Sequence, residues 1–397
     1  MRGALRARRL LRSTLQAALF LFDTLLLPFL RPGRHTGRDI LLLIRMDGIG
    51  DFVLFLPLAR RILAAWHDKG GEAVLVMNQA SSALVAGLEG VADVISIDRK
   101  RFRLDPAYRF RRLSQIRSLG AHEALDAAFS RDASLGDAVV RFSGAPVRLG
   151  WQGDCQNTPA WLKTVADRAY TRLFPNPEGP VNEIRAYESL AEHLGLRVSA
   201  PSALPWLATP IEGVPEAYYI LAPQAGAGLR QWPADRFAGL AERIHERTGL
   251  TGVLVGDGRA TGIFRAIHQG CRAPLVDLDG RIGLGKLAGV IAGARFLAGN
   301  DSAPIHLAAL LGVGTIAALA GAQFGRFLPY VHSSLHCYRA PLAVHHPMPC
   351  FGCNWICPFV SSPAFTAPCV ERITLDAMWE RLLEIPEVTQ AMKEPTP

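Results

Sequence analysis

The strongest restriction on the fold of this chain is a glycine-containing turn that directly follows an unbroken aliphatic run. The run Ile40–Ile44 contains only isoleucine and leucine, as expected of a strand buried on both faces of a parallel sheet. In the next segment, Arg45–Asp51, Gly48 and Gly50 let the backbone turn tightly into a helix. About 250 residues later, Gly299–His306 also follows an apolar run and opens a helix. We therefore expect two nucleotide-binding α/β halves that face one cleft.

Apolar runs alternate with amphipathic stretches in both halves of the chain, which is typical of a βαβ series. A polar stretch, 150–180, interrupts the first series, and a proline-rich segment, 197–215, separates the two series as a predicted linker. The predicted strands are Ile40–Arg45, Ala73–Met77, Val94–Ile97, Leu125–Phe129, Tyr218–Leu221, Val253–Val255, Phe296–Ala298 and Thr315–Leu319, and the predicted helices include Glu183–Leu194 and Pro304–Leu311.

The positive charge of this chain is concentrated at its start. Among 397 residues, 49% are hydrophobic and 20% charged, so the chain can bury the cores of two globular domains. The net charge is +8, but residues 1–38 hold eight arginines against one acid, Asp23, which leaves about +1 for the rest. This distribution excludes a basic groove along nucleic acid and favours an anionic membrane surface as the partner of the first segment.

The segment 1–38 has the pattern of a membrane-associating arm. No cation lies between Arg12 and Arg31, but Asp23 and Pro28 disfavour a spanning helix, so we expect a helix in the plane of the membrane. Its apolar stripe is Leu11, Leu15, Ala18, Phe22, Leu25 and Phe29. Two alternatives are a signal peptide, although no small-x-small cleavage site follows, and a helix that packs this stripe on the protein's own core.

The first turn can bind an anion or position a carboxylate. A glycine-rich turn at a helix start presents backbone N–H groups to phosphate, but the third glycine of a dinucleotide fingerprint is missing here. A nicotinamide oxidoreductase is therefore disfavoured. Asp51 would repel a phosphate on that helix, so it is expected either to cap the helix or to accept a proton as a base.

Two segments of the second half are candidates for holding a diphosphate. Asp301 and Ser302 stand at a helix start, where Ser302 and nearby N–H groups can bind phosphate or simply cap the helix. His306 is either a ligand contact or a core histidine. The segment 222–233 is rich in small residues and offers Arg230 as a forked cation for phosphate oxygens.

Over residues 39–385 the chain resembles glycosyltransferase family 9, the heptosyltransferases of lipopolysaccharide inner-core assembly. The resemblance rests on three ordered motifs: the Arg45–Asp51 turn with the following Leu-Pro, the cation-x-Trp-Pro segment at 230–233, and Asn-Asp-Ser followed by His-Leu-Ala-Ala at 300–309. It implies a GT-B fold of two Rossmann-like, doubly wound domains and an inverting transfer from a nucleotide-activated sugar, typically ADP-heptose.

Residue by residue, the resemblance implies that Asp51 is the general base and that Arg230 contacts phosphate. It also places Asp301, Ser302 and Ala303 along the diphosphate. His306 completes the predicted nucleotide-sugar set. Arg45, Gly48 and Gly50 are predicted on the acceptor or phosphate side.

The chain departs from the family at three positions. Members of the family generally carry lysine at the position of Arg230 and glycine at that of Ala303. The segment after Val255 lacks the glutamate that members place near the ribose, and Asp257 is the candidate substitute.

Four of the seven cysteines form a cluster in the second half, Cys350, Cys353, Cys357 and Cys369, with two histidines, 345 and 346, close by. Such density can bind structural zinc or an iron–sulfur cluster, whereas unliganded or disulfide-linked cysteines are the alternative. Catalysis is expected to require no cofactor.

The sequence thus predicts an arm at 1–38, an acceptor-binding domain at 39–205, a nucleotide-sugar-binding domain at 206–385 with the cysteine loop 350–369, and a tail at 386–397. We expect an inverting glycosyltransferase that moves heptose from ADP-heptose to a lipopolysaccharide core or related lipid-linked glycan. It would be a peripheral protein on the cytoplasmic face of the bacterial inner membrane. The alternative is a non-catalytic nucleotide- or metal-binding assembly protein with the same fold.

Overall fold

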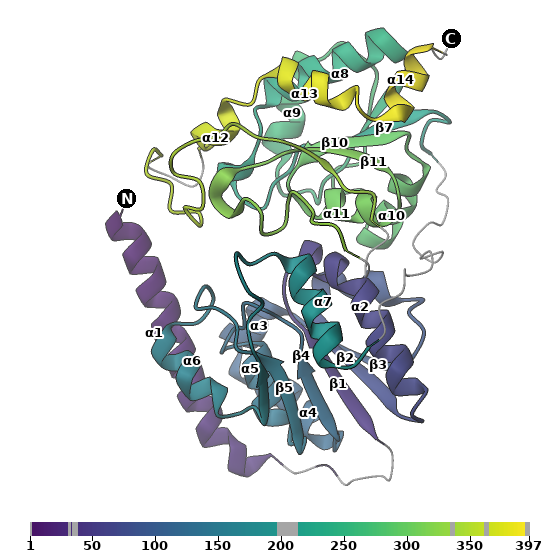
Figure 1. Cartoon of the computed structure of the whole chain (residues 1–397). Coiled ribbons are helices and arrows are strands. Elements are labelled where there is room, and N and C mark those ends of the chain that lie inside the picture. Colours follow the sequence, from purple (N-terminus) through teal and green to yellow (C-terminus); the bar gives the residue numbers. More distant parts are fainter. Residues whose placement is uncertain are drawn as a thin grey trace. The chain divides into compact units, whose positions relative to one another are not determined.

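The computed structural model divides into two compact units, Met1–Ser199 and Ala200–Pro397 (Figure 1). It describes residues 2–30, 33, 39–196, 213–333, 338–360 and 365–393, with the backbone alone for 2–9. The predicted domain boundary at 205/206 and Arg31 and Arg34 of the arm lie outside the described residues.

Unit 1 is built on a parallel sheet of six strands in the order β3-β2-β1-β4-β5-β6. The strands are β1 (Ile40–Arg45), β2 (Glu72–Asn78), β3 (Val91–Ile97), β4 (Glu123–Asp126), β5 (Val147–Trp151) and β6 (Arg172–Phe174). The helices are α1 (Arg2–Leu26), α2 (Ile49–His67), α3 (Arg99–Leu104), α4 (Pro106–Ser118), α5 (Gly136–Ser143), α6 (Ala160–Asp167) and α7 (Glu183–His193).

Unit 2 repeats the architecture, with a parallel sheet in the order β12-β11-β10-β7-β8-β9. The strands are β7 (Tyr218–Ala222), β8 (Thr251–Leu254), β9 (Leu275–Asp277), β10 (Phe296–Asn300), β11 (Gly314–Ala318) and β12 (Leu342–Val344). The helices are α8 (Ala234–Thr248), α9 (Thr261–Gly270), α10 (Leu284–Gly293), α11 (Ala303–Leu310), α12 (Pro368–Glu371), α13 (Leu375–Leu382) and α14 (Pro386–Lys393).

Local chemistry explains why these elements begin and end where they do. All six residues of β1 are buried, which matches a strand covered by helices on both faces. Asn182 caps α7, because its side-chain oxygen accepts the amides of Ile184 and Arg185. The helix α8 ends at Gly249, whose φ of 70° is in the left-handed region that favours glycine.

The sequence-based elements omit the strands β5, β9 and β12, and two further differences concern unit 1. The fourth strand ends at Asp126, and the apolar residues 127–129, predicted as its continuation, form a buried loop. The stretch 150–180, which breaks the apolar alternation, contains the edge strand β6. An edge strand this short carries too few residues for an alternating pattern to be visible.

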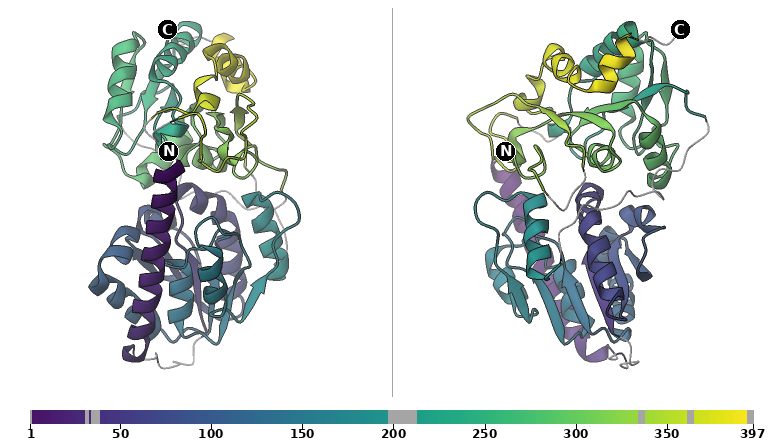
Figure 2. Two further views of the ribbon diagram at one scale, coloured as in Figure 1. Left: turned by 90° about the vertical axis from the view of Figure 1, so that its left-hand side faces the viewer. Right: turned by 45° about the vertical axis from the view of Figure 1, so that its right-hand side comes forward.

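The ends of the chain are parts of the two units. The first helix, α1, runs along one side of unit 1 (Figure 2). The last helix, α14, belongs to unit 2, because its Val388 is buried in the core of that unit. The predicted tail at 386–397 is therefore not a separate segment over 386–393, and residues 394–397 lie outside the described part.

Candidate functional site

Each sheet has a point where the strand order reverses. In unit 1 the chain runs from β1 outward to β3 and returns at β4, on the other side of β1; in unit 2 it runs from β7 outward to β9 and returns at β10. In open parallel sheets, ligands bind outside the carboxyl ends of the strands at this switch point. The segments after β1, β7 and β10 carry the predicted site residues of the catalytic and nucleotide-sugar sets except Asp257, which follows β8. The topology therefore brings most of each unit's candidates to its own switch point.

Asp51 is the third residue of α2 and is half-buried. The amide of Gly48 donates a hydrogen bond to its Oδ2, at 3.1 Å. A Cβ on Gly48 would lie 2.9 Å from that same oxygen, so a side chain there would crowd the carboxylate. The N-cap residue of α2 is Gly48, and Asp51 takes part in capping only by accepting the Gly48 amide. Its base role, and the placement of Gly48 and Gly50 on the acceptor or phosphate side, stay predictions.

Arg45 lies beneath this turn and points into the protein. Its side chain is 1% exposed; it donates to the carbonyl of Ala127 and the hydroxyl of Tyr187, both at 2.7 Å, and pairs with Asp47 at 3.0 Å. Burial lowers the pKa of Arg45, but Tyr187, Asp47 and Glu183 together outweigh it and the net pKa is raised. In this position Arg45 is a buried cation that holds the turn, and its placement on the acceptor or phosphate side stays a prediction.

Sequence reasoning missed α7 as a support for the first turn. Tyr187 of α7 binds Arg45 and lies 3.4 Å from the carbonyl oxygen of Asp51, to which its hydroxyl donates. Asn78, at the end of β2, donates to the carbonyl of Asp47 at 2.7 Å. These residues lie far from the turn in sequence, so no local spacing could have revealed them.

A buried carboxylate cluster at the end of β4 was also missed. Asp126 is 1% exposed, and the hydroxyl of Tyr170 lies 3.4 Å from it while donating to Asp137 at 2.6 Å. Burial, with a contribution from Asp137, raises the pKa of Asp126 to about 7. A group that exchanges a proton near neutral pH therefore stands next to β1 at the switch point of unit 1.

In unit 2 three predicted residues influence one another through their charges: Arg230, Asp301 and His306. Nε2 of His306 lies 3.6 Å from Oδ1 of Asp301, and both side chains are almost fully buried. Burial lowers the pKa of His306, the charge of Asp301 opposes this, and the charge of Arg230 adds to it. At neutral pH His306 is therefore an uncharged ring, whose Nδ1 lies 2.8 Å from the hydroxyl of Tyr330. Tyr330 had no signal in the sequence.

Arg230 is placed by aromatic and small neighbours. Its guanidinium lies 4.9 Å from the ring centre of Trp355, and its Nε is buried with no hydrogen-bond partner among the described residues. A Cβ on Gly226 would lie 2.7 Å from the guanidinium, so a larger residue there would require the end of the Arg230 side chain to shift. An under-satisfied, half-buried cation is suited to an anionic ligand.

Asn300 connects the two segments of unit 2 that are predicted to hold the diphosphate, 222–233 and 299–306. Its Oδ1 accepts the amide of Trp232 at 2.8 Å, and its Nδ2 donates to the carbonyl of Pro223 at 2.6 Å. The next residues continue the segment: Ser302 donates to the carbonyl of Asn300, and Ala303 begins α11. The diphosphate contacts predicted for Ser302 and Ala303 are untested.

Asp257 stands on the exposed loop after β8. Its carboxylate accepts a hydrogen bond from Nε2 of Gln224, at 2.5 Å, and pairs with Arg259 at 2.9 Å. Gln224 follows β7, so Asp257 is connected to the segment that carries Arg230. Its predicted role near the ribose stays a prediction.

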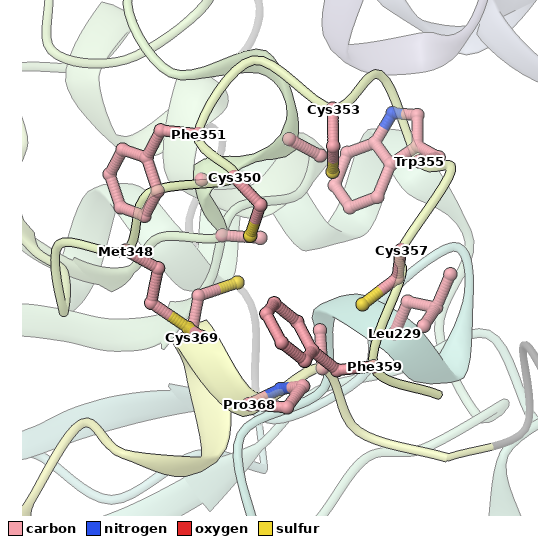
Figure 3. Close-up of a pocket in the computed structure, with 14 residues that line it drawn as sticks. Leu229, Met348, Cys350, Phe351, Cys353, Trp355, Cys357, Phe359, Pro368 and Cys369 are labelled. Carbon is pink, nitrogen blue, oxygen red and sulfur yellow. The ribbon is translucent and has the colours of Figure 1, made fainter. Parts of the chain in front are cut away.

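The four clustered cysteines line one pocket with Leu229, Phe351 and Trp355 (Figure 3). All four are free thiols, and burial raises the pKa of Cys353 and of Cys369, which keeps these thiols protonated at neutral pH. Within the described residues, no group of three or more His, Cys, Asp or Glu side chains is placed to hold a metal ion. The predicted zinc or iron–sulfur ligand set, Cys350, Cys353, Cys357 and Cys369, is therefore not formed by these side chains as they lie.

The cysteine loop instead supports the Arg230 segment. The amide of Ala367 donates to the carbonyl of Leu229 at 3.2 Å, and the hydroxyl of Thr366 donates to the carbonyl of Gln231 at 3.0 Å. Trp355, which stacks on Arg230, belongs to the same loop.

The sequence of this chain is similar to that of known glycosyltransferases. Residues 183–350 match the model of glycosyltransferase family 9 (heptosyltransferase). The chain is 31% identical over 185 residues to lipopolysaccharide heptosyltransferase 3 of Escherichia coli, an alignment that covers 43% of this chain and 52% of that protein. The resemblance to glycosyltransferase family 9 is confirmed. The chain spans about half the length of this curated relative.

Solved structures of glycosyltransferase family 9 share the fold over nearly the whole chain. A family 9 glycosyl transferase from Veillonella parvula has a TM-score of 0.66 at 15% identity and covers 90% of this chain and 98% of its own. The E. coli heptosyltransferase WaaC with ADP-2-deoxy-2-fluoro heptose has a TM-score of 0.64 at 18% identity, covering 87% and 99%. The predicted fold class, two Rossmann-like domains of the GT-B type, is confirmed.

Proposed function

We propose that this chain is an inverting glycosyltransferase that moves heptose from ADP-heptose to a lipopolysaccharide core or a related lipid-linked glycan. The observation that carries the proposal is the grouping of the half-buried Arg230 with the buried Asp301 and His306 at the switch point of unit 2, inside the segment that matches family 9. The relatives support the donor, because one is named a lipopolysaccharide heptosyltransferase and another was solved with an ADP-heptose analogue.

The reaction is a single displacement. Asp51 takes the proton of an acceptor hydroxyl, whose oxygen bonds to the anomeric carbon of the sugar as the bond to the nucleoside diphosphate breaks. Positioned proton transfer of this kind contributes about a hundred- to ten-thousandfold in rate. The diphosphate leaves with its charge met by Arg230 and by the N-terminal end of α11, which is positively polarised.

Metal independence is part of the proposal. Arg230 and the helix end supply the electrostatic stabilisation that a divalent cation provides in other transferases. Activity is therefore expected to persist in excess EDTA, and loss of activity that magnesium restores would contradict this. A lipid-linked acceptor also implies a peripheral location at the cytoplasmic face of the bacterial inner membrane.

Calorimetric titration of the full chain with ADP, GDP, UDP and NAD tests the donor. ADP is expected to bind in preference to the others. Replacing Arg230 by alanine removes hydrogen bonds to a charged group, so ADP affinity should fall by about ten- to a hundredfold. The matched control is Arg243→Ala, because Arg243 pairs with Asp376 on α13, away from the switch point, and should leave the affinity unchanged. Preference for GDP or UDP would keep the transferase and change the donor, whereas NAD binding alone would overturn the proposal.

The rival function is a non-catalytic assembly protein of the same fold. Ala303 in place of glycine and the missing glutamate favour it, because both concern the fit of the nucleotide. A folded protein that binds none of the four nucleotides would support this rival.

A further inference from the structure

The first helix, α1, attaches to unit 1 through its polar face. Three buried residues at helical spacing, Gln16, Leu19 and Asp23, face the unit. Nε2 of Gln16 donates to Oδ1 of Asp132 at 3.1 Å and to the carbonyl of Asn157 at 2.8 Å. An amphipathic helix of a soluble protein normally turns its apolar stripe toward the core, so this orientation is inverted.

A buried ion pair fastens this helix. Nε of Arg109, on α4, donates to Oδ1 of Asp23 at 2.6 Å, and a second guanidinium nitrogen bonds to Oδ2. Arg109 is fully buried and also donates to the carbonyls of Phe102 and Ser134. Removing one partner of such a pair leaves an uncompensated buried charge. A spanning helix or a cleaved signal peptide would withdraw Asp23 and leave Arg109 in that state, so the pair argues for an attached, retained helix.

The opposite face of α1, together with the short turn that follows the helix, carries apolar side chains that are exposed to solvent. Leu10, Leu11, Leu21, Leu25 and Phe29 are each 62–73% exposed. They are half of the large hydrophobic side chains that are exposed among the described residues. Of the predicted stripe, Leu11, Ala18, Leu25 and Phe29 are exposed, whereas Leu15 and Phe22 are half-buried, so most of the stripe does not pack on the protein's own core.

The arginines of the segment 1–38 indicate what kind of partner covers this apolar face. The segment 1–38 carries +7, and Arg12, at the edge of the apolar face, is 46% exposed while it pairs with Asp132. Apolar side chains flanked by arginines match the boundary between acyl chains and anionic headgroups. We propose that the outward face of α1 rests on an anionic bilayer, with the helix in the membrane plane and its polar face attached to unit 1 through Asp23 and Arg109. The proposal does not depend on the transfer reaction.

Vesicle co-sedimentation of the full chain tests this surface. The protein is expected to bind vesicles of phosphatidylethanolamine with phosphatidylglycerol, more weakly at high salt, and to bind phosphatidylcholine vesicles poorly. The double variant Leu21→Glu with Leu25→Glu should lower the partition coefficient at least tenfold. Phe365→Glu is the matched control, because Phe365 of unit 2 is 59% exposed and should leave binding unchanged. Circular dichroism checks that both variants fold.

Amide exchange around Arg109 separates a helix in the membrane plane from a spanning one. Protection in α4 is expected to be the same with and without vesicles, because the ion pair persists; faster exchange on vesicles would show that α1 has left unit 1. Equal vesicle binding by the double variant, or no binding to any vesicle, would overturn the proposal. A dimer that the double variant abolishes would do the same, since the occupant would then be a second copy of the chain.

Discussion

Asp51 illustrates how one side chain can serve both structure and chemistry. Its carboxylate caps α2 through Gly48, and the same carboxylate is the proposed base. Spacing alone could not separate these roles, because both need an acid in the first helical turn. A substitution that preserves the cap but not the base can separate them.

Asp51→Asn is that substitution. Asparagine also accepts the Gly48 amide, so α2 should stay intact, but its amide cannot accept the acceptor's proton. Turnover is expected to fall by about two to four orders of magnitude while ADP affinity stays nearly constant. Steady-state kinetics and calorimetry on the same preparation measure both. An equal loss of ADP affinity, or undiminished turnover, would remove Asp51 from the base role.

Asp126 should make the stability of unit 1 depend on pH. Its folded pKa, about 7, lies above the value of about 4 expected in the unfolded chain, so the folded state holds a proton that the unfolded state has lost. This contribution is complete below pH 4 and is lost as pH rises toward 7. Between pH 5 and pH 8 it should lower the free energy of unfolding by about 2 to 3 kcal/mol.

Asp126→Asn removes this titration and retains the shape of the side chain. Urea unfolding of both proteins at pH 5 and pH 8 should show that the variant loses less stability than the natural protein over that interval. Asp93→Asn, at an exposed position on β3, is the control and should follow the natural protein. Parallel pH profiles for all three would contradict the assignment to Asp126.

At the scale of elements, central strands were predicted better than the segments that support them. β1 was found over the predicted residues, because its unbroken aliphatic run reflects burial on both faces. The run 125–129 was overextended, since a buried loop needs apolar residues as much as a strand does. Apolar composition indicates that a segment is buried. Only the hydrogen bonds to neighbouring strands distinguish a buried strand from a buried loop.

Asn300 links two elements of unit 2, and its removal should loosen both. Asn300→Ala leaves the amide of Trp232 and the carbonyl of Pro223 without their buried partner, each costing about 1–3 kcal/mol. We expect a lower melting temperature for unit 2. We also expect weaker ADP binding, because Arg230 lies in the segment between Pro223 and Trp232, the two residues that Asn300 holds. Scanning calorimetry and nucleotide titration measure the two effects. A variant with unchanged melting temperature and affinity would show that the link is dispensable.

At the scale of the whole molecule, each unit has its own core and its own switch point. Donor binding is therefore expected to act on one unit. Amide exchange of the full chain with ADP should show added protection in 222–233 and 299–306 and little change in 40–51. NAD, which is expected to bind more weakly than ADP, provides the control. Protection by ADP confined to unit 1 would reverse the assigned roles of the two units.

The sequence alone identified the α/β class, the two turns and the resemblance to glycosyltransferase family 9, because strand burial, glycine turns and motif spacing are local properties of the chain. It could not decide which way the polar and apolar faces of α1 point, because that depends on Arg109, which lies 86 positions beyond Asp23. It also missed Tyr187, Tyr330 and the raised pKa of Asp126. These side chains acquire their partners, and their altered pKa values, only when distant strands and helices enclose them in a medium of low dielectric constant.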